Sequence, residues 1–263
     1  MLKQGRKMKL ARIEHDGRLA IGKVVGEKIV VLDGSLFDIQ GETDIQYSLA
    51  DVKLLPPVIP TKIACIGLNY REHIEEVGLS TPEAPHLFLK PPSCLIGHEE
   101  AIIIPKGAER VDYEGELAVV IKKKAKAVAE EEALNYVLGY SCFNDVTERS
   151  IVMKNMGDLT LAKCFDTFGP FGPYIVTDLD ITNLTINTYL NGRRVQNDNT
   201  KNFVFSIPHI IHYLSQAITF YPGDIIITGT PRGIGPINAG DVVEVEIEGI
   251  GRLRNPVRSF EDR

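Results

Sequence analysis

Residues 112–121 read Asp-Tyr-Glu-Gly-Glu-Leu-Ala-Val-Val-Ile, an acidic pattern that runs directly into an apolar strand. Side chains alternate between the two faces of a β-strand, so Glu114 and Glu116 are predicted to point the same way. Two carboxylates held that close repel each other, and at neutral pH a cation is the simplest remedy. Their oxygen ligands suit a hard divalent metal such as Mg²⁺ or Mn²⁺. The alternative is an edge strand whose solvated face carries two glutamates.

The bulk composition bounds the class of protein. The chain has 263 residues, enough for one large domain or for a large domain and a small one. Its 44% hydrophobic and 24% charged residues are ordinary for a globular enzyme. A net charge of −6 argues against nucleic-acid or anionic-membrane binding, and no apolar run approaches the roughly 18 residues that span a bilayer. We therefore expect neither a nucleic acid nor a membrane as a partner.

The N-terminus and the cysteines favour a cytoplasmic protein. Residues 1–8 are basic but no apolar run follows them, so they do not form a signal peptide. Both Met1 and Met8 are possible starts of translation. The four cysteines are scattered singly, without a C-x-x-C pair or zinc-ligand spacing, at Cys65, Cys94, Cys142 and Cys164. We expect them to be reduced and mostly buried.

Residues 1–60 are predicted to form a small β domain that ends in a proline-rich connector. Short apolar segments flank Asp16-Gly17, a favoured hairpin turn. The strands expected here are residues 10–13, 19–21 and 28–32. Three prolines within residues 55–60 exclude helix and central-strand pairing, so this connector is extended. The boundary is placed there, and residues 61–263 form the larger domain.

The larger domain is predicted to be mainly β (α+β), with a few short helices. Its clearest strands are residues 62–67, 224–228 and 241–247. The expected helices are residues 69–78, 129–138 and 206–217. Asn69 with Glu72 resembles a capping box, and Gly78 is a plausible stop for the first helix. Ser206 is the expected N-cap of the third helix.

Asp145 supplies a third candidate carboxylate. It follows an apolar strand, so its side chain emerges at the rim of the core rather than on an open face. Three carboxylates facing one point, completed by water or substrate, would form an octahedral Mg²⁺ site. Spacing alone leaves two possibilities open, a ligand beside Glu114 and Glu116 or a turn aspartate at a strand end.

Several short motifs occur in a fixed order. They are Gly67-Leu68-Asn69-Tyr70 with His73, Lys90-Pro91-Pro92-Ser93, Asp112-Tyr113-Glu114-Gly115-Glu116-Leu117, Asn144-Asp145-Val146, Lys163-Cys164-Phe165-Asp166-Thr167-Phe168-Gly169-Pro170 and Thr228-Gly229-Thr230-Pro231. This series resembles the fumarylacetoacetate hydrolase family across residues 62–257. The resemblance implies that family's mixed β-sandwich roll, preceded by a small N-terminal β domain as in many bacterial members. The branch it is most similar to holds 2-hydroxyhepta-2,4-diene-1,7-dioate isomerases, oxaloacetate decarboxylases and acylpyruvate hydrolases.

The resemblance also implies a role for each matching residue. The metal ligands, for Mg²⁺ or Mn²⁺, would be Glu114, Glu116 and Asp145. The catalytic residues would be His73, Glu76 and Lys163, with the histidine activating water and the lysine facing the substrate or its developing negative charge. The substrate-binding residues would be Arg149 and Thr230. Without the resemblance, His73 and Lys163 could be surface residues, Arg149 a counter-ion to Asp145, and Thr230 part of a turn.

Helical spacing supports one pair of these roles independently. His73 and Glu76 are three residues apart and share a helix face, so the carboxylate can orient the imidazole and raise its basicity. General-base catalysis requires such a base and its orienting partner. A short helix with a polar outer face can also open and close over bound substrate.

Two positions depart from the family pattern. After Asp145, many members carry an acid and a glutamine where this chain has Ser150 and Val152. In the hydrolases of the family that glutamine helps to hold a substrate oxygen, so the resemblance does not fix the substrate.

We expect a divalent-metal-dependent enzyme that acts on a small 2-oxo or 1,3-diketo acid through an enolate. C–C bond hydrolysis or decarboxylation is the first hypothesis, and an isomerase or tautomerase of 2-hydroxyhepta-2,4-diene-1,7-dioate or oxaloacetate is the alternative. A non-catalytic 2-oxo-acid-binding protein is a rival of another class. The resemblance also implies a homodimer.

Overall fold

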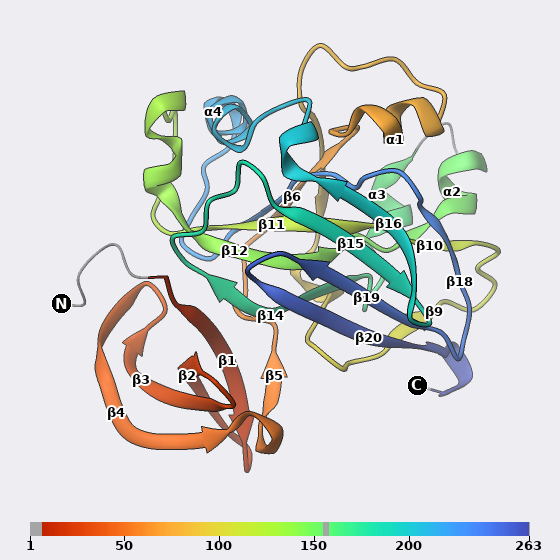
Figure 1. The fold of residues 1–263 in the computed structure, drawn as a ribbon. Helices are drawn as coiled ribbons and strands as arrows, with labels where there is room; N and C mark the ends of the chain where they lie inside the picture. The colour runs from red at the N-terminus through yellow and green to blue at the C-terminus, as the bar shows by residue number, and fades with distance from the viewer. Residues whose placement is uncertain (1–6, 155–157, 263) are drawn as a thin grey trace.

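The computed structural model describes residues 7–154 and 158–262, and strands dominate its architecture (Figure 1). The main sheet runs in the order β4 (Asp38–Ser48), β3 (Lys28–Ser35), β2 (Arg18–Val25), β1 (Lys9–His15), β14 (Gly169–Val176), β12 (Val137–Asn144), β11 (Gly115–Ile121), β17 (Ile225–Ile227), β6 (Ile63–Gly67) and β7 (His86–Lys90). Off this path, β5 (Lys53–Leu55) pairs with β1 and β8 (Leu95–Ile96) pairs with β14. The prediction of a mainly β protein is confirmed.

Two smaller sheets and a few helices complete the described residues. One sheet contains β13 (Thr147–Glu148), β10 (Val111–Tyr113) and β18 (Gly235–Ile237). The other contains β16 (Arg193–Asn199), β15 (Thr185–Leu190), β19 (Val242–Ile247), β20 (Gly251–Ser259) and β9 (Ile102–Ile104). The α-helices are α1 (Arg71–Glu76), α2 (Arg149–Lys154), α3 (Leu159–Lys163) and α4 (Ile207–Ala217). The 3₁₀ helices are η1 (Leu49–Asp51), η2 (Pro92–Cys94), η3 (Glu130–Tyr136), η4 (Thr200–Asn202) and η5 (Phe260–Asp262). Within the described ranges, no helix is long and apolar enough to cross a membrane.

The N-terminal strands form a lobe of their own, joined to the rest by backbone pairing (Figure 1). β1 and β2 form the predicted hairpin, in which Asp16 and Gly17 adopt positive φ angles of 49° and 74°. β1 then pairs with β14 through Lys9 opposite Val176. The main sheet therefore runs without a break from the lobe into the larger part of the chain.

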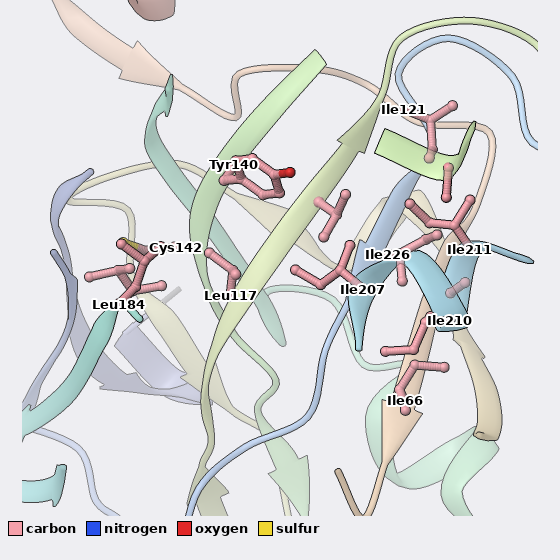
Figure 2. Packing of buried hydrophobic residues seen from close by; sticks show 14 of the residues in the cluster. Ile66, Leu117, Ile121, Tyr140, Cys142, Leu184, Ile207, Ile210, Ile211 and Ile226 are labelled. Carbon is pink, nitrogen blue, oxygen red and sulfur yellow. The ribbon is translucent and has the colours of Figure 1, made fainter. Parts of the chain in front are cut away.

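Strand β11 lies at the centre of the core and is buried along its whole length. Leu117, Val119 and Ile121 belong to one apolar cluster, while Ala118 and Val120 face another on the opposite side of the sheet. Figure 2 shows the first cluster, where side chains of α4 pack near Leu117 and Ile226; the labelled α4 residues are Ile207, Ile210 and Ile211. Each fully buried isoleucine stabilises the fold by about 2 kcal/mol. Burial on both faces explains why residues 117–121 form an unbroken apolar run.

The three predicted helices agree with the structure to different degrees. Helix α4 begins after Ser206, whose hydroxyl accepts from the His209 backbone N–H as predicted. Helix α1 is shorter than predicted, and Asn69 does not cap it, because the Asn69 amide bonds Thr228 O at 2.8 Å. The predicted helix at residues 129–138 is present as a 3₁₀ helix, η3, rather than an α-helix, and it ends at Tyr136 because β12 begins at Val137 and pairs with β11.

Asp224 ties the end of the connector to the start of β17. Its buried carboxylate accepts from the Thr61 backbone N–H at 2.9 Å, the Tyr221 N–H at 2.8 Å and the Lys62 ammonium at 2.5 Å. Burial raises the pKa of Asp224, but the hydrogen bonds from Lys62, Thr61 and Tyr221 outweigh it and leave the pKa lowered. The carboxylate therefore stabilises the folded state above its unfolded pKa, and this stabilisation disappears as pH falls through the lower folded pKa.

We predict that Asp224→Asn lowers the free energy of unfolding at pH 7 by about 2 kcal/mol, since it leaves buried donors poorly paired. The difference from wild type should shrink below about pH 4, where the unfolded carboxylate protonates. Urea unfolding at several pH values measures it, with the exposed Asp44→Asn as control. An equal loss at pH 7 and pH 3 would show that the charge is not responsible.

Candidate metal and catalytic site

The structure brings Glu114, Glu116 and Asp145 together. Glu114 lies between β10 and β11, Glu116 lies in β11, and Asp145 follows β12. The antiparallel register of β11 and β12 sets Gly115 opposite Asn144, and the Asp145 backbone N–H donates to Glu114 O at 2.8 Å. One oxygen from each of the three carboxylates lies within 4.8 Å of the others, and none of the three residues is more than 5% exposed. The alternative of a solvated edge strand is therefore excluded.

Backbone and hydroxyl donors orient these carboxylates. Glu116 Oε2 accepts from the Gly229 N–H at 2.6 Å, and Glu114 Oε1 accepts from the Thr147 hydroxyl at 3.1 Å. Gly229 has a φ of +94°, and an added Cβ would lie 2.8 Å from the Cβ of Asn69. Only glycine fits this turn, which explains why the Thr-Gly-Thr-Pro stretch can approach Glu116 so closely.

Three cationic side chains offset the negative charge. Lys163 Nζ lies 2.9 Å from Glu114 Oε2 and 2.5 Å from Asp145 Oδ2. Lys90 Nζ lies 2.8 Å from Asp145 Oδ1. Arg149 donates to Asp112 Oδ2 at 3.0 Å and also contacts Glu114, so it is not the counter-ion of Asp145.

Charge and burial shift the pKa values of the site in different directions. Burial raises the pKa of Glu114, but Lys163 and Arg149 outweigh it and hold that pKa at about 2. Burial, Asp145 and Glu114 together raise the pKa of Glu116 well above its usual range, because the pull of Lys163 does not cancel them. Burial lowers the pKa of Lys163, but Asp145 and Glu114 outweigh it and raise the pKa. Glu116 is thus the carboxylate that most needs a further cation.

The donor set fits a divalent metal ion. Asp145 Oδ1 lies 2.8 Å from the Lys90 ammonium, while Asp145 Oδ2 and Glu114 Oε2 face Lys163. Three buried carboxylates with an oxygen each within 4.8 Å of the others match the oxygen ligands that Mg²⁺ and Mn²⁺ prefer. The remaining positions of such a shell would be available to water or substrate.

His73 and Glu76 meet on α1 as their spacing predicted. His73 Nδ1 lies 2.9 Å from Glu76 Oε2, so Nδ1 carries the proton and Nε2 is left as the basic nitrogen. The Gly233 N–H donates to Glu76 Oε1 at 3.0 Å and holds this carboxylate in place. Only 8% of His73 is exposed, and its ring lies near enough to Glu114 for a positive charge there to lower the pKa of that carboxyl. The alternative of a surface histidine is excluded, and the dyad lies near the carboxylates.

Thr230 lies at the site, but its hydroxyl is already engaged. It donates to Gly115 O at 3.1 Å and accepts from Gln196 Nε2 at 2.9 Å. Gln196 Oε1 in turn accepts from the Gly115 N–H at 3.0 Å. The predicted contact of this hydroxyl with a substrate carboxylate would require exchange of the bond to Gly115.

Sequence reasoning did not assign Lys90, Asp112 or Gln196 to the site. The signals available for Lys90 were its place at the end of an apolar strand and in the Lys90-Pro91-Pro92-Ser93 motif. Ser150, one of the two departures from the family pattern, donates to Glu148 Oε1 at 2.6 Å at the start of α2. Val152, the other departure, lies half-buried in that helix.

The comparison with known families accounts for this arrangement. The pattern described as Fumarylacetoacetate (FAA) hydrolase C-terminal matches residues 62–258, and the one described as Rv2993c-like, N-terminal matches residues 8–57. The chain belongs to the fumarylacetoacetate hydrolase family. It is therefore an enzyme of that family, whose members include tautomerases, isomerases and hydrolases.

Three similar proteins illustrate this range. The mitochondrial oxaloacetate tautomerase fahd2 of Xenopus laevis is 42% identical over 222 residues, which cover 80% of this chain and 70% of that protein. The crystal structure of 5-carboxymethyl-2-hydroxymuconate delta-isomerase from Mycobacterium smegmatis is 38% identical, with a TM-score of 0.90 over 96% of this chain and 100% of that chain. Maleylpyruvate hydrolase from Sphingobium sp. SYK-6, in complex with manganese(II) and pyruvate, is 30% identical, with a TM-score of 0.81 over 96% and 99%.

We predict that Glu116→Gln stabilises the metal-free protein, because it removes a buried charge that Asp145 and Glu114 repel. A carboxyl whose folded pKa is raised costs stability as pH rises from its unfolded pKa toward its folded pKa. The gain in Tm should therefore be small near pH 4 and grow toward pH 8. Calorimetry in EDTA measures it, with the exposed Glu27→Gln as control. A variant less stable than wild type at pH 8 would contradict the repulsion.

Proposed function

We propose that the protein binds Mg²⁺ or Mn²⁺ and acts on a small 2-oxo acid through an enolate-like transition state. The observation that carries this proposal is the buried set of three carboxylates beside Lys163 and the His73–Glu76 dyad. The manganese and pyruvate bound to maleylpyruvate hydrolase support the ion and the substrate class. Mere binding of a 2-oxo acid would not require a buried general base, so a non-catalytic role is disfavoured.

The carboxylates of Glu114, Glu116 and Asp145 would hold the metal ion. When bound, the ion polarises the 2-oxo group and stabilises the negative charge that develops there. Lys163, now paired with Glu114 and Asp145, is a buried cation that can offset the same charge on the substrate. The low pKa of Glu114 keeps this ligand ionised at any physiological pH.

His73 moves the proton. Its Nδ1–H is fixed on Glu76, so Nε2 is the atom that accepts a proton, and the carboxylate stabilises the imidazolium that results. In a tautomerase or isomerase reaction, the proton leaves the carbon next to the 2-oxo group and returns at another position. In hydrolysis, the proton comes from a water molecule that attacks the neighbouring carbonyl; the C–C bond next to that carbonyl then breaks, one fragment leaves as a carboxylic acid, and the enolate of the other takes up the proton at carbon.

Tautomerisation or isomerisation of a 2-oxo dicarboxylate is the reaction that we favour. Val152 stands where hydrolases of the family carry a glutamine for a substrate oxygen, and an apolar side chain cannot make that contact. The similarity to an oxaloacetate tautomerase and to a muconate isomerase supports the same choice. Hydrolysis is the second candidate, and the intact His73–Glu76 dyad favours it.

Exhaustive EDTA treatment should abolish turnover of a panel of 2-oxo acids that includes oxaloacetate. Loss of the cation removes the main stabilisation of the developing charge, so we expect at least a ~100-fold decrease, restored by Mg²⁺ or Mn²⁺. Glu27→Gln should behave as wild type, and Glu116→Gln should need far more metal. Full activity of the metal-free protein refutes the proposal, and no turnover of any acid with metal present favours the binding protein.

His73→Ala should reduce C–C hydrolysis far more than keto–enol tautomerisation. A general base contributes about 10²–10⁴-fold, and water is a much weaker acid than a carbon activated by a polarised carbonyl. Solvent bases can therefore replace the imidazole in tautomerisation but not in water activation. We expect a loss of about 10³-fold in hydrolysis and of about 10-fold or less in tautomerisation, measured on one substrate of each kind. Equal losses would mean that the role of His73 is different.

A further inference from the structure

Lys90 is a buried ammonium directly beside the three carboxylates. Its side chain is 0% exposed, and Nζ lies 2.8 Å from Asp145 Oδ1 and donates to Val146 O at 3.2 Å. It is the last residue of β7, where it pairs in register with Ile63 of β6. A strand that is hydrogen-bonded into the main sheet therefore fixes it, and protein atoms enclose its ammonium.

Lys163 differs from Lys90 in how it is held. It comes from the end of α3, a single short turn, and its Nζ contacts two of the three carboxylates. Both lysines approach Asp145, but at different oxygens. A metal ion on the three carboxylates would compete with Lys163 for Glu114 Oε2 and Asp145 Oδ2, whereas Lys90 sits at the other oxygen of Asp145.

A count of the charges at the site gives Lys90 and Lys163 different roles. Three ionised carboxylates exceed one divalent cation by a single negative charge, and the ammonium of Lys90 supplies one positive charge at the same place. Asp112 is paired with both Arg110 and Arg149, and Arg149 also contacts Glu114. With Lys90 in place the metal-loaded cluster carries no net negative charge, and the charge of Lys163 remains for an anionic group of the substrate.

We propose that Lys90 is a positioning residue, the fixed counter-charge that lets one site hold both a divalent cation and a carboxylate-bearing substrate. This inference rests on the proposed metal-dependent function. Lys90 repels the metal ion and attracts the anion, so its removal changes the two affinities in opposite directions. A residue that only supports packing would weaken both.

The test is calorimetric titration of full-length Lys90→Met with Mn²⁺, followed by titration of the manganese-loaded protein with oxalate. We expect the Kd for Mn²⁺ to fall about tenfold and the Kd for oxalate to rise about tenfold relative to wild type. Lys62→Met is the matched control, since Lys62 is a partly buried lysine paired with Asp224 outside the carboxylate cluster. It should lower stability and leave both Kd values unchanged.

A second variant keeps the inference testable if Lys90→Met folds poorly. Lys90→Gln also removes the charge but keeps a donor for Val146 O, and it should show the same opposite shifts. If both Kd values rise together, or neither changes, in a variant that remains folded, the inference about Lys90 is overturned while the proposed function stands. If wild type itself does not bind Mn²⁺, the proposed function fails, and this inference fails with it.

Discussion

Repulsion among three buried carboxylates is the constraint around which the rest of the structure is arranged. Their oxygens lie within 4.8 Å of one another, and such a cluster is costly to bury without compensation. The compensation comes from Lys90, Lys163 and Arg149 and from the N–H of Gly229. The three carboxylates are not compensated equally. Glu114 is held ionised, while the pKa of Glu116 is raised. That imbalance is what suits the cluster to a divalent cation.

The fold supplies the rigidity that this cluster needs. Strand β11 carries Glu116 and is buried on both faces, so its register against β12 is fixed by packing as well as by hydrogen bonds. The loop after β17 brings Gly229 and Thr230 to the same strand. The His73–Glu76 dyad instead lies on the short helix α1. Glu76 accepts a hydrogen bond from the Gly233 N–H in the loop after β17. Glu116 thus lies on a buried strand, with Glu114 and Asp145 at the ends of strands, whereas His73 and Glu76 lie on a short helix.

Local patterns predicted the parts of the site that local geometry controls. Strand alternation predicted that Glu114 and Glu116 share a direction, and helical spacing predicted the His73–Glu76 contact. Spacing could not place Asp145, because its approach to Glu114 depends on the register between two strands about thirty residues apart. The position of Asp145 after an apolar strand made it a candidate with two possible roles, and only the family resemblance chose the ligand role and brought Lys163 into the predicted set.

Long-range contacts also explain which site residues were not predicted and which predicted helix features differ from the structure. Lys90 meets Asp145 across 55 residues of sequence, and Gln196 meets Gly115 across 81, so no local pattern predicts either contact. Asn69 was predicted to cap a helix, but its side-chain amide N–H donates a hydrogen bond to Thr228 O, 159 residues away in the sequence. The 129–138 segment is helical as predicted over Glu130–Tyr136, but as a 3₁₀ helix, and pairing of β12 with β11 sets its end.

A crystal structure of the protein soaked with Mn²⁺ and oxalate tests the central claim most directly. Our account predicts one anomalous-scattering peak within about 2.3 Å of an oxygen from each of Glu114, Glu116 and Asp145, with oxalate completing the shell. It also predicts that Lys163 no longer bonds both Glu114 and Asp145, while Lys90 stays beside Asp145. Manganese bound away from these three carboxylates, or a cluster that stays closed around Lys163 with no metal in it, would contradict the account.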